Sequence, residues 1–276
     1  MTAITDLLRR LDACYDAIPR AAGARVEEWG PFLLFVRKPP GWPYYARPRA
    51  GVVSADAADV EAVRARQREL GVPQAFEWVH DLAPGVIEAV AASGLKVLQA
   101  PLMVLDPDRL PPPDGNASLL DPDAADFADT HAVSSAVARI AFRDLGKDNA
   151  TAAAGPAERD AAIATPDPAV VAHAAAGIRA GRTAEAVLNT PAEGIVARGG
   201  LQRAGGAAEI VGVATLPSAR RRGYGAAVSA ALARHALALG DGLVFLSAAS
   251  EDVARVYGRI GFRRVGTACI AGPPPN

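Results

Sequence analysis

The sequence contains 276 residues, 50% of them hydrophobic, and its formal net charge at pH 7 is −1. This composition supports one large globular domain or two ordinary ones. Because the overall charge is close to zero, it gives no reason to expect binding to nucleic acid or to a membrane surface. No apolar run approaches the roughly 20 residues that a transmembrane helix needs.

The N-terminal residues and the cysteines indicate a cytoplasmic protein. Met1 to Arg10 contain no apolar stretch of the kind found in a signal peptide. Cys14 and Cys269 lie far apart in the sequence, and we expect both to be reduced and buried. Neither has a histidine nearby, so a thiol nucleophile is not favoured. The four histidines show no ligand spacing, and no metal site is predicted.

The first 113 residues predict a mixed α/β arrangement. Asp56–Leu70 has the apolar spacing of a helix, and Phe76–Val79 has the pattern of a strand. Pro84–Ser93 predicts a second helix with proline in its first turn. The segment Asp106–Asn116 is rich in proline and polar residues, which is typical of a stiff linker, with a loop inside one core as the alternative. We therefore place a domain boundary near residue 113.

The second part, residues 114–276, predicts helices and strands in a clear order. Ala117–Leu120 is expected to form a strand and Ala124–Ile140 a helix, while prolines break residues 155–178 into two short helices. The following elements are strands at 183–188, 194–201 and 208–216, an alanine-rich helix ending at Gly240, a strand at 243–246, a helix at 253–260 and a last strand through Val265 to Ile270.

The most informative segment is Arg220–Gly225, which reads Arg-Arg-Arg-Gly-Tyr-Gly between a predicted strand and the alanine-rich helix. Backbone N–H groups at such a helix start carry partial positive charge, and glycine lets a phosphate approach them. Three arginines add charge suited to a pyrophosphate, although a solvated basic turn is the alternative. The segment lacks the Gly-Lys-Ser/Thr of a P-loop, and Val228 stands where a dinucleotide fingerprint needs a third small residue.

The spacing Arg-x-x-Gly-x-Gly resembles the acyl-CoA pyrophosphate loop of the GNAT N-acetyltransferase superfamily. A second motif, Tyr257 four residues before Gly261-Phe262, is similar to the end of a GNAT domain. The resemblance covers about residues 117–270. It implies an α/β (α+β) fold: a mixed, mostly antiparallel GNAT-like sheet flanked by helices and splayed where the cofactor enters. Residues 114–276 would then form the catalytic domain.

The N-terminal part resembles a degenerate copy of the C-terminal part. Gly94-Leu95 matches Gly261-Phe262 at an offset of 167 positions (261 minus 94), which also carries the helix at 224–239 onto 57–72. The same offset places Val53–Ala58 over the arginine-glycine loop, without a glycine or an arginine. Asp56 would favour a helix start but repel a pyrophosphate. We therefore expect a tandem GNAT arrangement with a degenerate domain at 1–113 and a single CoA site.

The resemblance assigns the cofactor, acetyl-CoA, to named residues. Backbone groups of Val213, Ala214 and Thr215 would bind the pantetheine arm as an added strand would. Ser250 stands where many relatives carry an asparagine that helps to hold this arm. The pyrophosphate would lie on the loop and helix start formed by Arg220, Arg221, Arg222, Gly223, Tyr224, Gly225 and Ala226.

Two side chains are candidate catalysts. Tyr257 is the candidate general acid for the departing thiolate, because a phenol and an alkyl thiol have similar pKa values; a residue of the amphipathic core is the alternative. Glu209 lies fourteen positions before Gly223, a spacing at which several GNAT enzymes place a base glutamate. It would take the amine proton through a water, with a solvent-facing carboxylate at the strand end as the alternative.

The acceptor site is expected in the least repetitive regions: residues 142–149, the proline-broken helices, and Trp29 and Trp42 of the N-terminal part. Asp144 and Asp148 would attract a cationic amine. Trp42 lies in an aromatic, proline-rich turn, for which a packed corner is the alternative.

Together these patterns predict an acyl-CoA-dependent N-acyltransferase, which transfers a group other than aminoacyl and works by direct transfer in a ternary complex. A small-molecule amine is favoured over a protein amine as acceptor, because no charged groove suited to a peptide is evident. The alternatives are a CoA-binding regulatory protein without turnover and a structural domain with a spare basic loop.

Overall fold

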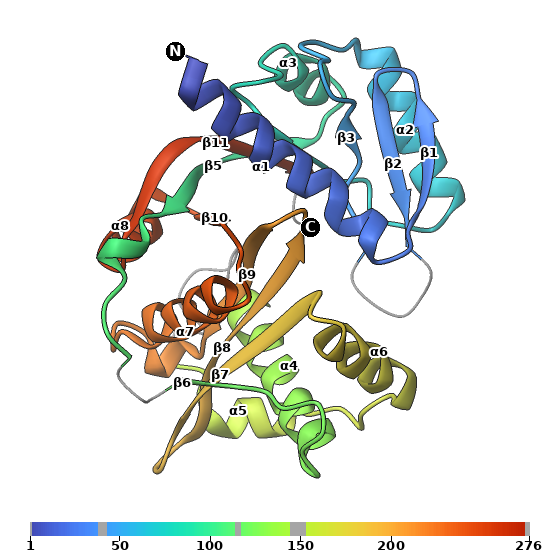
Figure 1. Ribbon diagram of the computed structural model, residues 1–276. Coiled ribbons are helices and arrows are strands. Elements are labelled where there is room, and N and C mark those ends of the chain that lie inside the picture. Colours follow the sequence, from blue (N-terminus) through green and yellow to red (C-terminus); the bar gives the residue numbers. More distant parts are fainter. Residues whose placement is uncertain (1, 38–42, 114–116, 144–152, 274–276) are drawn as a thin grey trace. The chain divides into compact units, whose positions relative to one another are not determined.

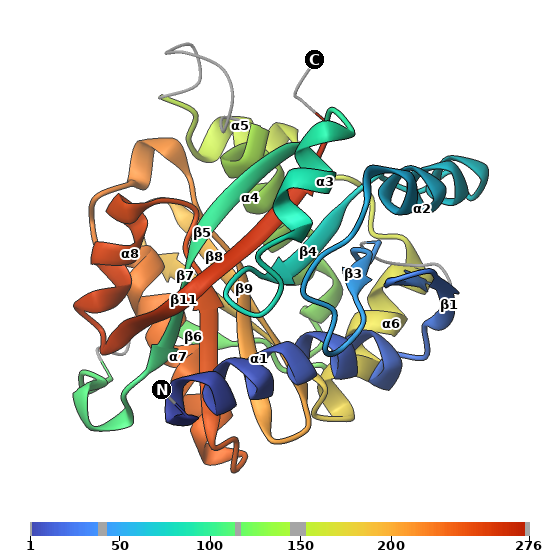
Figure 2. The same ribbon diagram turned by 90° about the horizontal axis from the view of Figure 1, so that it is seen from above.

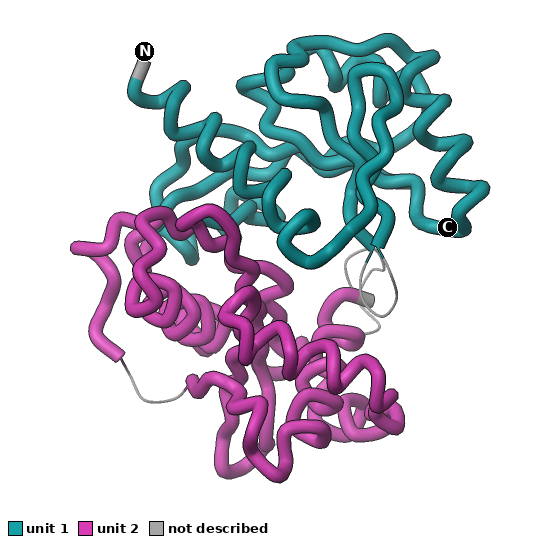
Figure 3. Tube along the Cα trace, turned by 45° about the vertical axis from the view of Figure 1, so that its right-hand side comes forward, with its two compact units in different colours: residues 1–104, 245–258, 262–276 teal, residues 105–244, 259–261 magenta. Residues whose placement is uncertain are grey.

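The computed structural model describes residues 2–37, 43–113, 117–143 and 153–273 of the chain. These residues form helices and strands in the order shown in Figure 1. The chain divides into two compact units, which Figure 3 distinguishes by colour. Unit 1 comprises residues 1–104, 245–258 and 262–276, and unit 2 comprises residues 105–244 and 259–261.

Unit 1 combines the N-terminal part of the chain with its last strands. The strands β1 (Arg25–Trp29), β2 (Phe32–Val36) and β3 (Arg47–Pro48) form a small antiparallel sheet. Four strands pair in the order β4-β11-β5-β10, and Figure 2 shows β4, β11 and β5 of this set side by side. The bounds are α1 Thr2–Ala21, α2 Ala57–Glu69, β4 Phe76–Val79, α3 Val86–Ala92, β5 Lys96–Leu105, β10 Leu243–Ser247, α8 Glu251–Gly258 and β11 Phe262–Gly272.

Aromatic residues form the centre of the unit 1 core. The rings of Phe32 and Phe76 meet edge to face with their centroids 5.3 Å apart, and Trp78 lies fully buried beside them. Burial of a phenylalanine of this kind contributes about 1.5–3 kcal/mol. Cys269 and Ala271 of β11 belong to the same buried cluster. The C-terminal strand therefore completes the core of unit 1.

The element order of the N-terminal part repeats in the C-terminal part. A shift of 167 positions carries α2 onto 224–236, β4 onto 243–246 and β5 onto 263–272, which coincide with α7, β10 and β11. The antiparallel pairs β10–β5 and β4–β11 are equivalent under this shift. The last strand of the N-terminal part, β5, thus pairs with β10 of the C-terminal part, and the last strand of the C-terminal part, β11, pairs with β4. This exchange covers strand edges that would otherwise be exposed. This exchange explains why the compact units do not follow the predicted boundary near residue 113, and the duplication itself remains our proposal.

Unit 2 holds the remaining strands in the order β9-β8-β7-β6, all paired antiparallel. Arg198 of β8 bonds to Ser134 of α4, whereas the next residue, Gly199, faces Val228 and Leu232 of α7. The helices α4 and α7 therefore cover opposite faces of this sheet. The bounds are β6 Ala117–Leu119, α4 Phe127–Arg143, α5 Pro156–Ala161, α6 Pro168–Arg179, β7 Thr183–Thr190, β8 Gly194–Ala204, β9 Ala207–Thr215 and α7 Tyr224–Ala238.

The predicted elements from Asp56 onward are confirmed, most of them within three residues at each end. Pro156 and Pro168 open the two short helices, since proline is favoured in a first helical turn. Within the predicted linker the structure has a short 3-10 turn, η1 (Pro107–Arg109). Sequence patterns missed α1, the strands β1 to β3 and the strand β5. Both cysteines are buried and neither forms a disulfide, as predicted.

Across the described part of the chain, none of the helices has both the length and the apolar character needed to cross a membrane.

Candidate functional site

The strand β9 carries a β-bulge at the residues predicted to bind pantetheine. Ala214 pairs with Arg198 of β8, but Val211 pairs with Gly200, so Gly212 and Val213 together oppose one residue of β8. Gly212 has a φ of +59°, a conformation that glycine adopts at little cost. The Gly212 carbonyl accepts a hydrogen bond of 3.1 Å from Arg198 Nη1. A bulge interrupts the ladder of backbone hydrogen bonds, and here the interruption lies at Gly212 and Val213.

The chain then turns through η2 (Pro217–Ala219) into the arginine-glycine loop and α7. Gly223 is the N-cap residue of α7, with φ +82° and ψ −1°, and no side chain caps the helix there. The first helical backbone bond joins Ala227 N–H to the Gly223 carbonyl. The N–H groups of Tyr224, Gly225 and Ala226 therefore have no partner within the helix. This open helix start, beside a left-handed glycine, has the geometry of an anion site.

The structure divides the three arginines of the loop into two kinds. Arg220 Nη2 donates to the Ala141 carbonyl at the end of α4. Arg222 donates to Glu193 Oε2 at 2.8 Å and to the Ser218 carbonyl at 3.2 Å. Its pKa is raised by a hydrogen bond to the Tyr224 side chain and by the nearby Glu193 carboxylate. These two arginines brace the loop.

Arg221 differs from both neighbours. Its side chain is exposed, and its guanidinium has no hydrogen-bond or ion-pair partner among the described residues. Its φ of +64° makes it the one residue other than glycine with a positive φ in the described part of the chain. Such strain persists where the surrounding structure requires it, and it often marks a functional position. Arg221 is therefore the loop arginine with a charge free for a ligand.

Glu209 lies near the start of β9, where it pairs with Gln202 of β8. Strand alternation along β8 puts Gln202 on the same face as Arg198, so Glu209 faces the α4 side of the sheet. The side chain is 8% exposed and takes part in a polar interaction. This burial is at odds with a solvent-facing carboxylate at the strand end.

Tyr257 and Ser250 belong to unit 1. Tyr257 lies on α8, is 8% exposed, and meets the Phe262 ring edge to face at a centroid distance of 6.0 Å. Ser250 is exposed just before α8, and its hydroxyl accepts a hydrogen bond of 3.3 Å from the Val253 N–H. This serine thus caps the start of α8.

A buried polar cluster on the α4 side of unit 2 was not anticipated from the sequence. His131 Nδ1 lies 2.8 Å from Glu185 Oε2, and Arg198 Nη2 lies 3.0 Å from Glu185 Oε1. Ser134 donates to the same Oε1 and accepts a bond of 3.1 Å from Arg198 Nε. Burial alone would raise the pKa of Glu185, but Arg198, His131 and Ser134 lower it to about 2. The sequence signal was a charged residue at the middle of each of two largely apolar strands, at 185 and 198.

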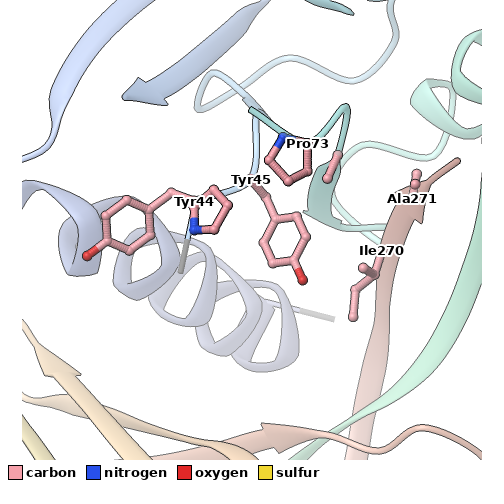
Figure 4. Close-up of a pocket in the computed structure, with 8 residues that line it drawn as sticks. Tyr44, Tyr45, Pro73, Ile270 and Ala271 are labelled. Atoms are coloured by element: carbon pink, nitrogen blue, oxygen red, sulfur yellow. The ribbon is translucent and has the colours of Figure 1, made fainter. Parts of the chain in front are cut away.

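The regions predicted to bind the acceptor are partly visible. Trp29 ends β1 and donates from Nε1 to Glu27 at 3.2 Å. Trp42, Asp144 and Asp148 lie outside the described residues. A hollow of about 220 Å³ in unit 1 is lined by apolar residues that include Tyr44, Tyr45 and Ile270 (Figure 4). None of the predicted site residues lines this hollow.

Comparison with known proteins supports the predicted resemblance. Residues 192–270 match the sequence model of a GNAT-related family described as FR47-like protein. This segment includes the bulge, the loop, α7 and Tyr257. No curated protein matches the chain.

Solved structures match nearly the whole chain. A GCN5-related N-acetyltransferase from Kribbella flavida is 21% identical, with 98% of this chain and 96% of that chain covered and a TM-score of 0.68. A conserved protein of unknown function from Staphylococcus epidermidis is 12% identical, with coverage of 91% and 94% and a TM-score of 0.56. A GCN5-related N-acetyltransferase-like protein from Streptococcus suis is 10% identical, with coverage of 98% and 99% and a TM-score of 0.52.

The chain therefore has the fold of the GNAT superfamily, and the predicted fold class is confirmed. This fold and the FR47-like segment together support an acyltransferase role.

Proposed function

We propose that this protein transfers an acetyl group from acetyl-CoA to a primary amine of a small molecule. The observation that carries the proposal is the open start of α7. There the left-handed Gly223, three N–H groups without helical partners and the unpaired Arg221 together form a site for a pyrophosphate. The bulge in β9 supports the assignment, because it interrupts the strand ladder at Gly212 and Val213, where the segment Val213 to Thr215 proposed to bind the extended pantetheine arm begins.

The corresponding helix of the N-terminal part supports a single site. At the start of α2, Asp59 Oδ2 accepts a hydrogen bond of 3.2 Å from the Asp56 N–H. A carboxylate thus already occupies the position where an anion would bind, and its charge would repel a pyrophosphate. We therefore assign the acetyl-CoA site to α7 alone.

The proposed reaction is direct transfer in a ternary complex. The amine must lose a proton, attack the thioester carbonyl carbon and expel a thiolate that is then protonated. Tyr257 is proposed as the acid that protonates the thiolate. Glu209 is the base proposed from sequence spacing, and its burial on the α4 side suits proton transfer through a water rather than direct contact with the amine.

The decisive test is calorimetric titration of the full-length protein with acetyl-CoA, free CoA and ATP. The proposal predicts one saturable acetyl-CoA site per chain and no response to ATP. A panel of small amines, with a lysine-containing peptide as the protein-amine alternative, then tests turnover. Two equal acetyl-CoA sites would overturn the assignment to α7 alone, and the absence of any binding would overturn the proposed function.

A CoA-binding regulatory protein is the second candidate, and the role of Ser250 favours it. The Ser250 hydroxyl already accepts the Val253 N–H, so it is a weaker partner for pantetheine than an amide. This candidate predicts tight acetyl-CoA binding without turnover of any amine in the panel. Steady release of free thiol in the presence of one amine would rule it out.

A further inference from the structure

The buried cluster around Glu185 contains a carboxylate and a histidine in the arrangement of a general base with its orienting group. The contact runs from Glu185 Oε2 to the Nδ1 atom of His131 at 2.8 Å. The His131 ring also stacks on the Phe127 ring, with centroids 5.9 Å apart and planes 16° from parallel. A carboxylate on one ring nitrogen fixes the tautomer and leaves the other nitrogen to accept a proton.

The second ring nitrogen of His131 is free for such a role. Nε2 has no hydrogen-bond partner among the residues that the structure describes. The His131 side chain is 16% exposed, compared with 8% for Glu185. The pair thus combines a shielded carboxylate with an imidazole that reaches solvent. A base needs this access, because it must return its proton to water in every turnover.

Arg198 connects this pair to the bulge of β9. Its Nη2 contacts Glu185 and its Nη1 donates to the Gly212 carbonyl, so one guanidinium spans the two features. Because Glu185, Arg198 and Glu209 all face α4, the histidine shares a sheet face with the base proposed from sequence. The bulge is where the thioester end of the pantetheine arm is proposed to lie.

We propose that His131 is the general base that deprotonates the acceptor amine, directly or through one water, and that Glu185 is its positioning residue. The inference rests on the proposed acetyltransferase function and replaces Glu209 in the role of base. Arg198 then has a structural role. Its guanidinium bonds to both the Glu185 carboxylate and the Gly212 carbonyl and so fixes the position of the carboxylate relative to the bulge.

The proton balance of the reaction is complete. His131 Nε2 accepts one proton from the bound ammonium and later releases it to water. The amine lone pair forms the C–N bond to the acetyl carbonyl carbon, and the C–S bond breaks with its electron pair on sulfur. The nitrogen loses a second proton to water as the amide forms. The thiolate gains a proton from Tyr257, and Tyr257 then regains a proton from water. One ammonium and acetyl-CoA thus yield one amide, CoA thiol and one proton.

Charged side chains lie on several of the elements around His131. Glu185 on β7 contacts His131 and places a negative charge beside the imidazolium that forms during turnover, and Arg198 on β8 pairs with the same carboxylate. Glu209 on β9 faces the same helix, and Asp129 on α4 itself is exposed. Imidazole is the side chain that gains and loses a proton most readily near neutral pH.

The test is the pH dependence of kcat/KM for His131→Gln, with an acceptor amine whose own pKa lies above 9. If His131 is the base, the wild-type enzyme binds the ammonium form, and log kcat/KM reaches a plateau above neutral pH. The variant should lose about a hundredfold in kcat, and its profile should rise steadily toward the pKa of the amine. Free imidazole should restore part of the activity of His131→Ala.

Matched variants separate this role from a structural one. His235→Gln, in the last turn of α7, should behave as wild type in rate and pH profile. Glu209→Gln should keep the plateau. The acetyl-CoA dissociation constant of His131→Gln should stay unchanged, because the base does not contact the cofactor loop. Glu185→Gln should lower kcat at unchanged acetyl-CoA affinity, provided that its circular dichroism spectrum shows a folded chain.

A plateau and normal kcat in His131→Gln would overturn the inference while leaving the proposed function intact. Loss of the plateau in Glu209→Gln instead would also overturn it and return the base to Glu209. Failure of the wild-type protein to bind acetyl-CoA or to acetylate any amine would overturn the proposed function itself, so the two failures are distinguishable.

Discussion

Replacement of Gly223 by alanine isolates the contribution of the left-handed turn before α7. An alanine Cβ at this position would meet no atom within 4 Å, so no steric clash is introduced. The cost comes from the backbone, because φ is +82° and a residue with a Cβ disfavours this region by about 1–2 kcal/mol. The variant loop should relax to a negative φ in the free protein and return to the left-handed form when the pyrophosphate binds.

The expected effect on binding follows from that strain. If about 1–2 kcal/mol must be restored on binding, the acetyl-CoA dissociation constant should rise about 5- to 30-fold. The matched control is Gly240→Ala, at the other end of α7, where φ is +85° and the space around a Cβ is also open. Gly240→Ala should lose about 1–2 kcal/mol of its free energy of unfolding. Its affinity for acetyl-CoA should equal that of the wild type.

Isothermal titration with acetyl-CoA and urea unfolding of both variants give the two quantities. Wild-type affinity in Gly223→Ala would refute the assignment of the α7 start as the pyrophosphate site. An equal loss of affinity in Gly240→Ala would also refute the reasoning, since a general loss of stability would then explain both results.

Three further outcomes follow from the contacts in the structure. Arg221→Ala should weaken acetyl-CoA binding about tenfold at low salt and much less at 0.5 M salt, because salt screens the lost charge. Its stability should not change, because the guanidinium has no partner among the described residues to lose. An equal loss of affinity at both salt concentrations in titration would contradict this. Tyr257→Phe keeps the ring contact with Phe262 but removes the proton donor, so kcat should fall about a hundredfold at unchanged acetyl-CoA affinity. A normal kcat in steady-state assays would exclude Tyr257 as the acid. The pKa of Glu185 is about 2, below the ordinary value of 4.5, so its contribution to stability is complete above pH 4.5 and is lost as the pH falls toward 2. The unfolding temperature of the wild type should fall as the pH is lowered from 4.5 toward 2, relative to that of Glu185→Gln. If the two proteins lose stability in parallel over this pH range, the assigned role of the Glu185 carboxylate is wrong.

The sequence predicted the C-terminal elements well because they carry strong local signals. The alternation of β7, β8 and β9, the glycine-rich turn into α7 and the prolines that open α5 and α6 are all written in short windows of sequence. The same holds for the Arg-x-x-Gly-x-Gly loop, whose recognition requires only spacing. The long helix α1 and the short strands β1 to β3 were not predicted. The N-terminal elements were found by their match to the C-terminal part at an offset of 167 positions, and these four elements have no counterpart there.

The equivalence of the three loop arginines was a prediction that the structure refined. Sequence spacing treats Arg220, Arg221 and Arg222 alike, because each carries the same charge. Contacts with Ala141, Glu193 and Ser218 distinguish them, and these partners lie between 4 and 79 positions away along the chain. Whether a charge is free or already paired is decided by such distant contacts.

The sequence by itself determined the class of fold, and it also predicts an anion-binding turn at residues 220–225 and no such turn in the N-terminal part. Each depends on neighbouring residues, since helix starts, glycine turns and strand alternation are local properties of the chain. Tertiary structure decided that the last strand of each repeat pairs within unit 1, that β9 is bulged at Gly212 and that His131 meets Glu185 across 54 positions. These features depend on strand register and on the packing of α4 against the sheet, which bring together residues that no short window of sequence contains.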